Sequence, residues 1–196
     1  MTKKIVVGIT GASGVIYGIR LLEFLKSAGC ETHLIISTAG RLNINIETDF
    51  SVESVCALAD HIYEPEEMAA TVASGSFLTD GMVVVPCTIK TLSGIANSFT
   101  ENLLLRAADV TLKEKRRLVL MVRETPLHRG HLRLMDQAAE MGAVILPPMP
   151  SFYHRPKTID DIINQTIGKI CDSLKIKNDL FQRWGNENID TGPFIV

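Results

Sequence analysis

The chain has 196 residues, of which 46% are hydrophobic and 21% are charged, and its formal net charge is −2. This composition is typical of one globular domain with a sizeable core and excludes a disordered chain. The charge gives no support to a nucleic-acid-binding protein, and no apolar run reaches the roughly 20 residues of a membrane helix. We therefore expect a cytoplasmic protein with no nucleic-acid partner and no membrane span.

Short apolar runs alternate with amphipathic patterns along the chain. They predict strands at 5–10, 32–37, 82–87, 117–122 and 143–148, and helices at 15–28, 51–59, 100–115, 127–141 and 160–174. The four later strands are near-continuous apolar runs, which is typical of a parallel sheet covered on both faces. Segment 61–81 is the least regular, and we expect a loop-rich connection there that can include one helical turn.

This alternation predicts an α/β fold, a doubly wound three-layer sandwich with a central parallel sheet. We expect a single domain over residues 1–185, followed by a C-terminal tail over residues 186–196. In such sheets, ligands bind beyond the carboxyl ends of the strands. The residues that follow the predicted strands are rich in small hydroxyls and backbone donors: 11–14, 37–38, 87–91, 123–126 and 147–153.

The first of these turns, TGASG, favours a close approach of a ligand to the backbone. Gly11 and Gly14 permit positive φ angles, and the following helix points its N-terminal N–H groups at the same spot, where an anion would be stabilised. A dinucleotide is disfavoured, because Ile16 stands where the GxGxxG fingerprint needs glycine and no acidic residue ends the second strand. A mononucleotide such as FMN remains. The alternative is a tight strand-to-helix turn with no ligand.

Two further groups of side chains lie at predicted strand ends. The hydroxyls of Thr88, Thr91 and Ser93 would hold a second part of the same ligand, whereas a helix N-cap explains only one of them. Arg123 and Glu124 end a buried strand, and a charged pair there is either a structural ion pair or functional, because burying an unpaired charge is costly.

The sequence gives little support to a metal site, and we expect none. The four cysteines are scattered without zinc spacing, so we expect reduced, buried thiols, with Cys87 at a strand end as the one with a second possibility. Glu124, His128 and His131 would share a helix face only if the helix began before Glu124. Pro126 favours a helix that starts no earlier than that residue.

Seven stretches carry a resemblance that spans nearly the whole chain to Trp184: GITGASGVIYGIRLL, ETHLIIS, INIETDFS, ASGSFLTDGMVVVPCTIKTLSGIA, LLLRAADVTLKEKRRLVLMVRETPLHRGHLRLM, GAVILPPMPSFYHRP and DLFQRWG. Together they resemble the UbiX-type flavin prenyltransferases, the UbiX/Pad family. The resemblance implies a flavodoxin-like domain that binds FMN between subunits of a homo-oligomer, a dodecamer, without a metal. It implies transfer of a dimethylallyl group from dimethylallyl monophosphate to N5 and C6 of reduced FMN, which gives prenylated FMN for a UbiD-type decarboxylase.

The resemblance also implies the site residues, position by position. FMN contacts fall on Gly11, Ala12, Ser13, Ser37, Thr88, Ile89, Lys90, Thr91 and Arg123. Contacts to the dimethylallyl phosphate fall on Tyr153, Lys169, Lys113, Arg123 and Glu124. Lys169 is arginine in some members, and Thr88 is often serine.

Three of these residues are implied to be catalytic. Ser13 would face the reactive edge of the flavin, and Glu124 would pass a proton between the flavin and the leaving phosphate. Trp184 would form an aromatic wall against the allyl cation, or else simply pack the tail. For Lys113, at a predicted helix C-terminus, the alternative is pairing with the helix dipole.

Three other functions stay open at this point. An FMN-dependent cysteine decarboxylase on the same fold would carry Pro-Ala-Ser-Ala-Asn-Thr where residues 86–91 read PCTIKT, and the surroundings of His61 do not match its catalytic histidine. An aromatic acid decarboxylase would need an acid-binding site, and none is evident outside the flavin cleft. A passive FMN carrier would not need the second phosphate site. The receiving decarboxylase, and its role in ubiquinone synthesis or aromatic-acid breakdown, stay open too.

Overall fold

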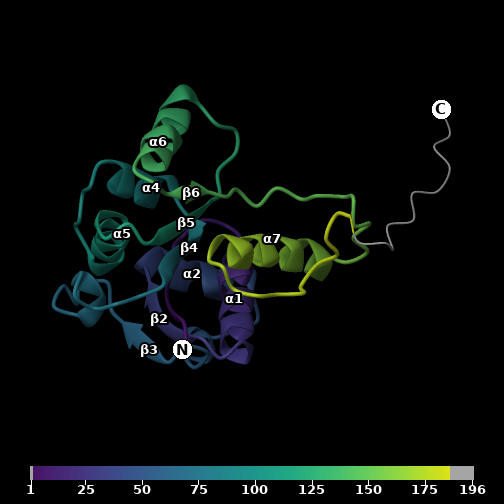
Figure 1. The fold of residues 1–196 in the computed structure, drawn as a ribbon, viewed down its shortest axis with the longest axis horizontal. Coiled ribbons are helices and arrows are strands. Elements are labelled where there is room, and N and C mark those ends of the chain that lie inside the picture. Colours follow the sequence, from purple (N-terminus) through teal and green to yellow (C-terminus); the bar gives the residue numbers. More distant parts are fainter. Residues whose placement is uncertain (1, 186–196) are drawn as a thin grey trace.

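The computed structural model describes residues 2–185, so the predicted tail over 186–196 lies outside the described residues. Six parallel strands form one sheet with the order β3-β2-β1-β4-β5-β6 (Figure 1). The strands are β1 (Lys4–Ile9), β2 (Glu31–Ile36), β3 (His61–Tyr63), β4 (Gly81–Cys87), β5 (Arg117–Val122) and β6 (Val144–Ile145). Without the short edge strand β3, this order is that of the flavodoxin-like fold, which confirms the predicted fold class.

Seven α-helices and one 3₁₀ helix connect the strands within the described part of the chain. They are α1 (Val15–Ser27), α2 (Thr38–Glu47), α3 (Val52–Cys56), η1 (Thr71–Ala73), α4 (Ile89–Ala96), α5 (Leu103–Lys113), α6 (Arg129–Glu140) and α7 (Ile159–Ser173). None of the helices in residues 2–185 is long and apolar enough to cross a membrane.

Each face of the sheet carries its own hydrophobic core. Along β4, Val83 and Val85 join the cluster that contains α1 and α7, whereas Met82 and Val84 join the cluster that contains α4, α5 and α6. Successive residues of a strand point to opposite faces. Burial on both faces therefore explains why the central strands read as continuous apolar runs in the sequence.

The structure contains three elements that were not predicted. Helix α2 was not predicted, because its sequence TAGRLNINIE has a weak apolar pattern and buries only Gly40 and Ile44. Helix α4 was not predicted as an element, although a helix N-cap was considered at its start. The loop-rich segment 61–81 contains one helical turn, η1, as the sequence allowed, and also strand β3. The last strand is shorter than predicted, since Pro147 and Pro148 lack the N–H groups that a ladder needs.

The region around α6 rules out one arrangement considered from the sequence. Helix α6 begins at Arg129, after Pro126 as predicted, and His128 is its N-cap. Glu124 therefore lies outside the helix, and Glu124, His128 and His131 do not share one helix face.

The prediction of free cysteines is confirmed: Cys30, Cys56, Cys87 and Cys171 are all unpaired.

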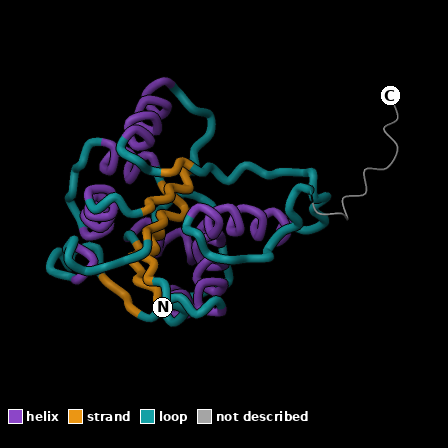
Figure 2. The backbone as a smooth tube through the Cα atoms, in the orientation of Figure 1, coloured by secondary structure: helices purple, strands orange, loops and turns teal. Residues whose placement is uncertain are grey.

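Two loops leave the body of the molecule beside α7 (Figure 2). We call residues 147–158 and 177–185 the arm. Its second loop is fastened to α7: Asn178 Nδ2 donates to the Gly168 carbonyl at 3.3 Å, and the Arg183 guanidinium binds the Asp172 carboxylate at 2.7 and 2.8 Å. Phe181 packs so closely on Gly168 that a Cβ there would lie 2.4 Å from the ring. The arm thus has a defined position against α7.

Candidate active site

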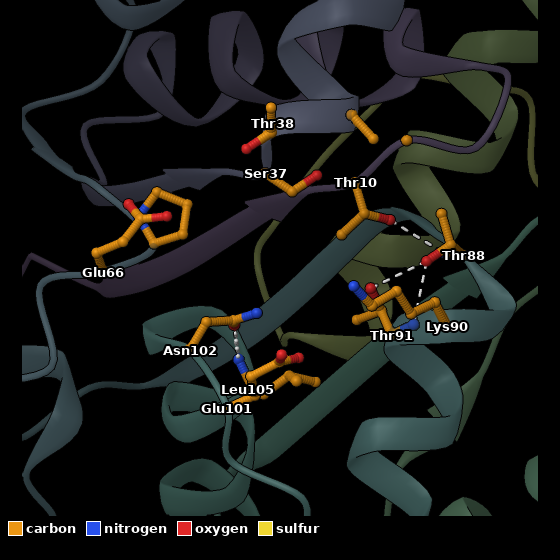
Figure 3. A pocket seen from close by; sticks show the side chains of 13 residues that line it. Thr10, Ser37, Thr38, Glu66, Thr88, Lys90, Thr91, Glu101, Asn102 and Leu105 are labelled. Atoms are coloured by element: carbon orange, nitrogen blue, oxygen red, sulfur yellow. Dashed lines mark hydrogen bonds between the residues drawn. The ribbon is translucent and has the colours of Figure 1, made fainter.

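A cavity of about 550 Å³ opens beyond the carboxyl ends of β1, β2 and β4 (Figure 3). This is the point at which the strand order reverses, where open α/β sheets bind ligands. The volume lies within the roughly 300–1,000 Å³ of small-molecule sites. The lining residues are Thr10, Gly11, Ser37, Thr38, Ala39, Pro65, Glu66, Thr88, Lys90, Thr91, Glu101, Asn102 and Leu105.

Three helices begin at this cavity, each behind a polar cap. Ser37 Oγ accepts from Gly40 N at 3.1 Å, Thr88 Oγ1 accepts from Thr91 N at 3.1 Å, and Asn102 Oδ1 accepts from Leu105 N at 3.0 Å. Helix N-termini carry partial positive charge and bind anions. Among the described lining residues, Lys90 alone adds a full positive charge, whereas Glu66 and Glu101 add negative charge. The part of the cavity next to Lys90 and the helix N-termini is therefore the part suited to a phosphate group.

Thr10 ties the floor of this cavity together and was not predicted as a site residue. Its Oγ1 donates to the Pro86 carbonyl at 2.7 Å and accepts from Thr88 N at 2.9 Å. Thr10 is only 2% exposed, so both bonds are shielded from water. The loop after β1 is thus locked to the loop after β4. The sequence offered only one signal, a hydroxyl at the last position of a predicted strand.

The glycines of the first turn act partly as predicted. Gly14 has φ +99°, a conformation that glycine adopts without strain. Gly11 is needed for a reason that the sequence did not reveal, because a Cβ there would lie 2.3 Å from Ala39 Cβ. The turn therefore packs directly on the start of α2, and both line the same cavity.

The N-terminus of α1 differs from the prediction, which placed a ligand's anion there. The Glu47 carboxylate accepts from Gly14 N at 2.7 Å and from Val15 N at 3.3 Å. Glu47 is the last residue of α2, the helix that the sequence pattern did not predict. The anion at this helix terminus is thus a side chain of the protein, and the N-termini of α2, α4 and α5 are the ones that face the cavity.

The nine predicted FMN contacts fall into two groups. Five line the cavity: Gly11, Ser37, Thr88, Lys90 and Thr91. Of the other four, Ala12 is buried and Ser13 exposed in the same turn, while Ile89 lines a neighbouring hollow of about 540 Å³ that Lys90 also lines, with Ser93 and residues of α6. Arg123 follows the end of β5, the strand next to β4.

The expected buried pair of Arg123 and Glu124 is wrong. Strand β5 ends at Val122, so both residues lie beyond it and are exposed. Arg123 N donates to the Cys87 carbonyl at 3.1 Å, which joins the two strand ends. Within residues 2–185 neither side chain forms an ion pair, and the guanidinium faces solvent. Arg123 is thus available to an anionic ligand.

The remaining predicted residues lie away from the cavity within one chain. Tyr153 and Trp184 meet on the arm with their rings perpendicular and the centroids 5.6 Å apart, and Trp184 is 73% exposed. Lys169 is exposed on α7. Lys113 pairs with Glu114 at the C-terminus of α5, just before the start of β5. It therefore lies at the amino ends of the strands, opposite the ends that line the cavity.

Cys87, at the end of β4, is not a nucleophile of this site. It is fully buried, and this burial raises the pKa of its thiol far above the ordinary value. The thiolate is the reactive form of cysteine, so Cys87 is inert at neutral pH. Its role is packing, as the sequence predicted for the cysteines.

The arrangement fits a mononucleotide such as FMN better than a dinucleotide. Three helix N-termini and the hydroxyls of Ser37, Thr88 and Thr91 surround one cavity of suitable volume. The closeness of Gly11 to Ala39 leaves the first turn without a projecting side chain at that point. A flat ring system can therefore lie against the backbone while its phosphate faces the helix termini.

Comparisons with known proteins agree with this geometry. Residues 1–176 match the family described as Flavoprotein. The flavin prenyltransferase UbiX of Escherichia coli strain K12 is 58% identical over 185 residues, which cover 93% of this chain and 98% of that protein.

Two solved structures share the fold closely. The crystal structure of AnUbiX (PadA1) in complex with FMN and dimethylallyl pyrophosphate matches with a TM-score of 0.92 and 46% identity, over 94% of this chain and 98% of that one. A dodecameric FMN-dependent UbiX-like decarboxylase from Escherichia coli O157:H7 matches with a TM-score of 0.90 and 44% identity, over 92% of this chain and 98% of that one.

Proposed function

Because the chain belongs to the Flavoprotein family and, within it, to the UbiX flavin prenyltransferases, we propose that it transfers the dimethylallyl group of dimethylallyl monophosphate to reduced FMN. The protein is a flavin prenyltransferase and binds FMN. The observation that carries the proposed site is the cavity, because it brings together five of the nine residues expected to hold FMN.

Ser37, Thr88 and Thr91 hold the FMN phosphate with Lys90 and the adjoining N-termini of α2 and α4. This assignment is supported by the position of these residues, which line the cavity at the first turns of α2 and α4. Gly11 and Ala12 lie against the ring, and Ser13 faces its reactive edge. When bound, reduced FMN supplies N5 and C6 as the atoms that accept the prenyl carbons.

The leaving phosphate of the donor is stabilised by positive charge as the allylic C–O bond breaks and the phosphate departs with the electron pair. Arg123 is the cation of one chain best placed for this, since its guanidinium is exposed and free of an ion pair within residues 2–185. Glu124, the next residue, passes a proton between the flavin and the phosphate. Tyr153, Lys169 and Lys113 add the remaining contacts to the donor.

Several of these residues reach the site from a neighbouring subunit. Lys113 lies at the amino ends of the strands, opposite the cavity, and Tyr153 and Trp184 lie on the arm. One chain therefore does not gather these residues at its own cavity. The solved relative from Escherichia coli O157:H7 is described as dodecameric, which supports a homo-oligomer of the same order here. In this homo-oligomer, Trp184 and Tyr153 of one subunit screen the allyl cation from water at the cavity of the neighbouring subunit.

The product, prenylated FMN, passes to a UbiD-type decarboxylase in the cytoplasm. The two rival activities are not favoured. The curated relative at 58% identity is named a flavin prenyltransferase, and the motif of the cysteine decarboxylases is replaced by PCTIKT at residues 86–91.

One anaerobic experiment tests the proposal. The purified protein is mixed with reduced FMN and, in separate arms, dimethylallyl monophosphate or dimethylallyl pyrophosphate, and the released flavin is weighed by mass spectrometry. A gain of one five-carbon prenyl unit in the monophosphate arm supports the proposal, and a gain in the pyrophosphate arm alone contradicts the proposed donor. An unchanged flavin, with carbon dioxide released from a cysteine peptide or an aromatic acid, supports a rival.

A further inference from the structure

Three metal-ligating side chains converge at the end of the sheet opposite the cavity. Glu31 and His33 point to the same side of β2, and His61 is the register partner of His33 on β3. Glu31 Oε1 lies 3.2 Å from His33 Nε2 and 3.4 Å from His61 Nε2. All three donor atoms lie within 4.8 Å of one another.

We propose that Glu31, His33 and His61 form a binding site for Zn²⁺ or a similar divalent transition-metal ion. Two imidazole nitrogens and one carboxylate oxygen are a donor set that such ions favour. Metal–ligand bonds of about 2.0–2.2 Å in tetrahedral geometry place neighbouring donors roughly 3.3 Å apart. The two distances to Glu31 Oε1 have this value, so the cluster needs little rearrangement to enclose an ion.

The surroundings of His33 hold its ring in a ligating orientation. His33 Nδ1 lies 3.0 Å from the Tyr63 hydroxyl, which in turn lies 3.2 Å from Thr71 Oγ1. A hydrogen bond from Nδ1 leaves the lone pair on Nε2, the atom that faces Glu31. The ring is almost fully buried and stacks on His61 at a centroid distance of 4.6 Å. Metal-binding histidines are commonly oriented by such a bond at the other ring nitrogen.

Lys4 is the competitor that such an ion must overcome. Its Nζ lies 3.0 Å from Glu31 Oε2 and 3.1 Å from Glu31 Oε1, and it is 38% exposed. A bound divalent cation would repel this ammonium group, which can move into solvent because its stem is flexible. The metal and Lys4 therefore compete for the same carboxylate, and removing the lysine charge should tighten metal binding.

The ion would act on the structure and leave the flavin chemistry unaffected. Strand β3 pairs with β2 through only three residues and forms the edge of the sheet. An ion bound to both strands would fasten this edge and stabilise the folded state by mass action. Glu31 and His33 lie in the amino-terminal half of β2 and His61 is the first residue of β3, so all three are away from the strand ends that line the cavity. The fourth position of a tetrahedral ion would be left for water.

The test uses the full, tag-free chain after removal of metal by a chelator. Zn²⁺ is titrated by calorimetry, and Co²⁺ is titrated by visible absorption, which reports tetrahedral coordination. We expect one equivalent per chain, a higher unfolding temperature with Zn²⁺, and an unchanged rate of prenyl transfer after chelation. His61→Ala, at a side chain that is 49% exposed, should weaken binding at least 100-fold. Tyr63→Phe should weaken it roughly 10- to 100-fold, and Lys4→Met should tighten it.

The matched control is His131→Ala, which removes a histidine whose ring contacts that of His128 at the α6 end of the molecule (Figure 1). This variant should bind Zn²⁺ as the unaltered chain does. Binding lost in His131→Ala but retained in His61→Ala would overturn the proposal, as would equal binding in all variants or no binding in the unaltered chain. Circular dichroism of each metal-free variant checks that a loss does not come from misfolding. None of these outcomes depends on the prenyl transfer, so this proposal and the proposed function fail separately.

Discussion

The cavity and the arm carry different parts of the expected site, and they are built differently. The cavity is lined by residues of one chain: its hydroxyls cap helices, and Thr10 bonds the two strand ends that frame it. The arm carries Tyr153 and Trp184 at its surface, with their rings in contact with each other and Trp184 largely exposed. We therefore propose that the flavin-binding part is preformed, whereas the donor-binding part is completed by residues of a neighbouring chain.

The largest expected effect separates chemistry from flavin binding. Glu124→Gln keeps the shape of the side chain but removes its ability to carry a proton. We expect the rate of prenyl transfer to fall by roughly 10²- to 10⁴-fold, with the FMN dissociation constant unchanged, measured by anaerobic turnover and by fluorescence titration. Glu140→Gln, at the exposed end of α6, is the control and should be fully active. Intact turnover in Glu124→Gln would remove this residue from the mechanism.

A second variant tests whether the donor-binding part is completed by a neighbouring chain. Lys113→Ala should lower kcat/KM for the allylic phosphate by roughly 10- to 100-fold, the effect of losing one charged contact, and leave FMN affinity unchanged. The control is Lys115→Ala, two residues further along and exposed.

Mixed oligomers sharpen the same point. When Lys113→Ala and Glu124→Gln chains are dissociated and reassembled together, some cavities should receive an unaltered Lys113 from one chain and an unaltered Glu124 from another. Activity above that of either variant alone is expected. If the mixture is no more active than its components, Lys113 and Glu124 act within one chain, and the donor site is not completed by a neighbouring subunit.

A third variant weakens the flavin-binding part. Thr10→Val keeps the volume but removes a hydroxyl that makes two shielded hydrogen bonds. Thr88 N then loses its partner, and the Pro86 carbonyl keeps only the bond from Thr10 N at 3.2 Å. We expect a loss of about 1–3 kcal/mol in the free energy of unfolding and weaker FMN binding, measured by denaturant titration and fluorescence. The control is Thr111→Val, another buried threonine, whose hydroxyl donates to the Ala107 carbonyl within α5 and contacts Met82 Sδ, away from the cavity. It should lower stability without changing FMN affinity.

The sequence predicted the body of the fold well, because the central strands are buried on both faces and read as continuous apolar runs. It failed at α2, whose pattern is weak, and this omission hid Glu47, the residue that occupies the N-terminus of α1. It failed also at β3, which has three residues and is recognisable only by its pairing with β2. Both failures concern contacts between segments distant in sequence, which local periodicity does not encode.

In the candidate site, too, the residues marked by local sequence were predicted and those that depend on contacts between distant segments were not. Thr88 was predicted from its place after a strand, and that position does line the cavity. Thr10 and Asn102 were not predicted, because their contribution depends on which loops the sheet brings together. Lys113 could be named only from resemblance to a family, since neither its helix position nor its own chain places it at the cavity. Residues that act across subunits are beyond what the pattern of one chain reveals.

The smallest expected effect concerns how the arm is held. Hydrogen bonds from Arg183 lower the pKa of Asp172 below its ordinary value. A carboxylate with a lowered pKa stabilises the folded arm above its ordinary pKa of about 3.9, and this contribution is lost as the pH falls through the lower, folded value. For an ion pair this exposed we expect no more than about 1 kcal/mol. The fluorescence of Trp184, the only tryptophan, reports the position of the arm.

Asp172→Asn should therefore give, at neutral pH, the Trp184 emission that the unaltered chain reaches only below about pH 4. Asp160→Asn, at an exposed carboxylate paired with Arg20, is the control and should leave the emission unchanged. If Trp184 emission in Asp172→Asn matches that of the unaltered chain, the ion pair does not position the arm. The aromatic pair would then be held by Phe181 against Gly168, and the arm would be as firmly fixed as the cavity it is compared with.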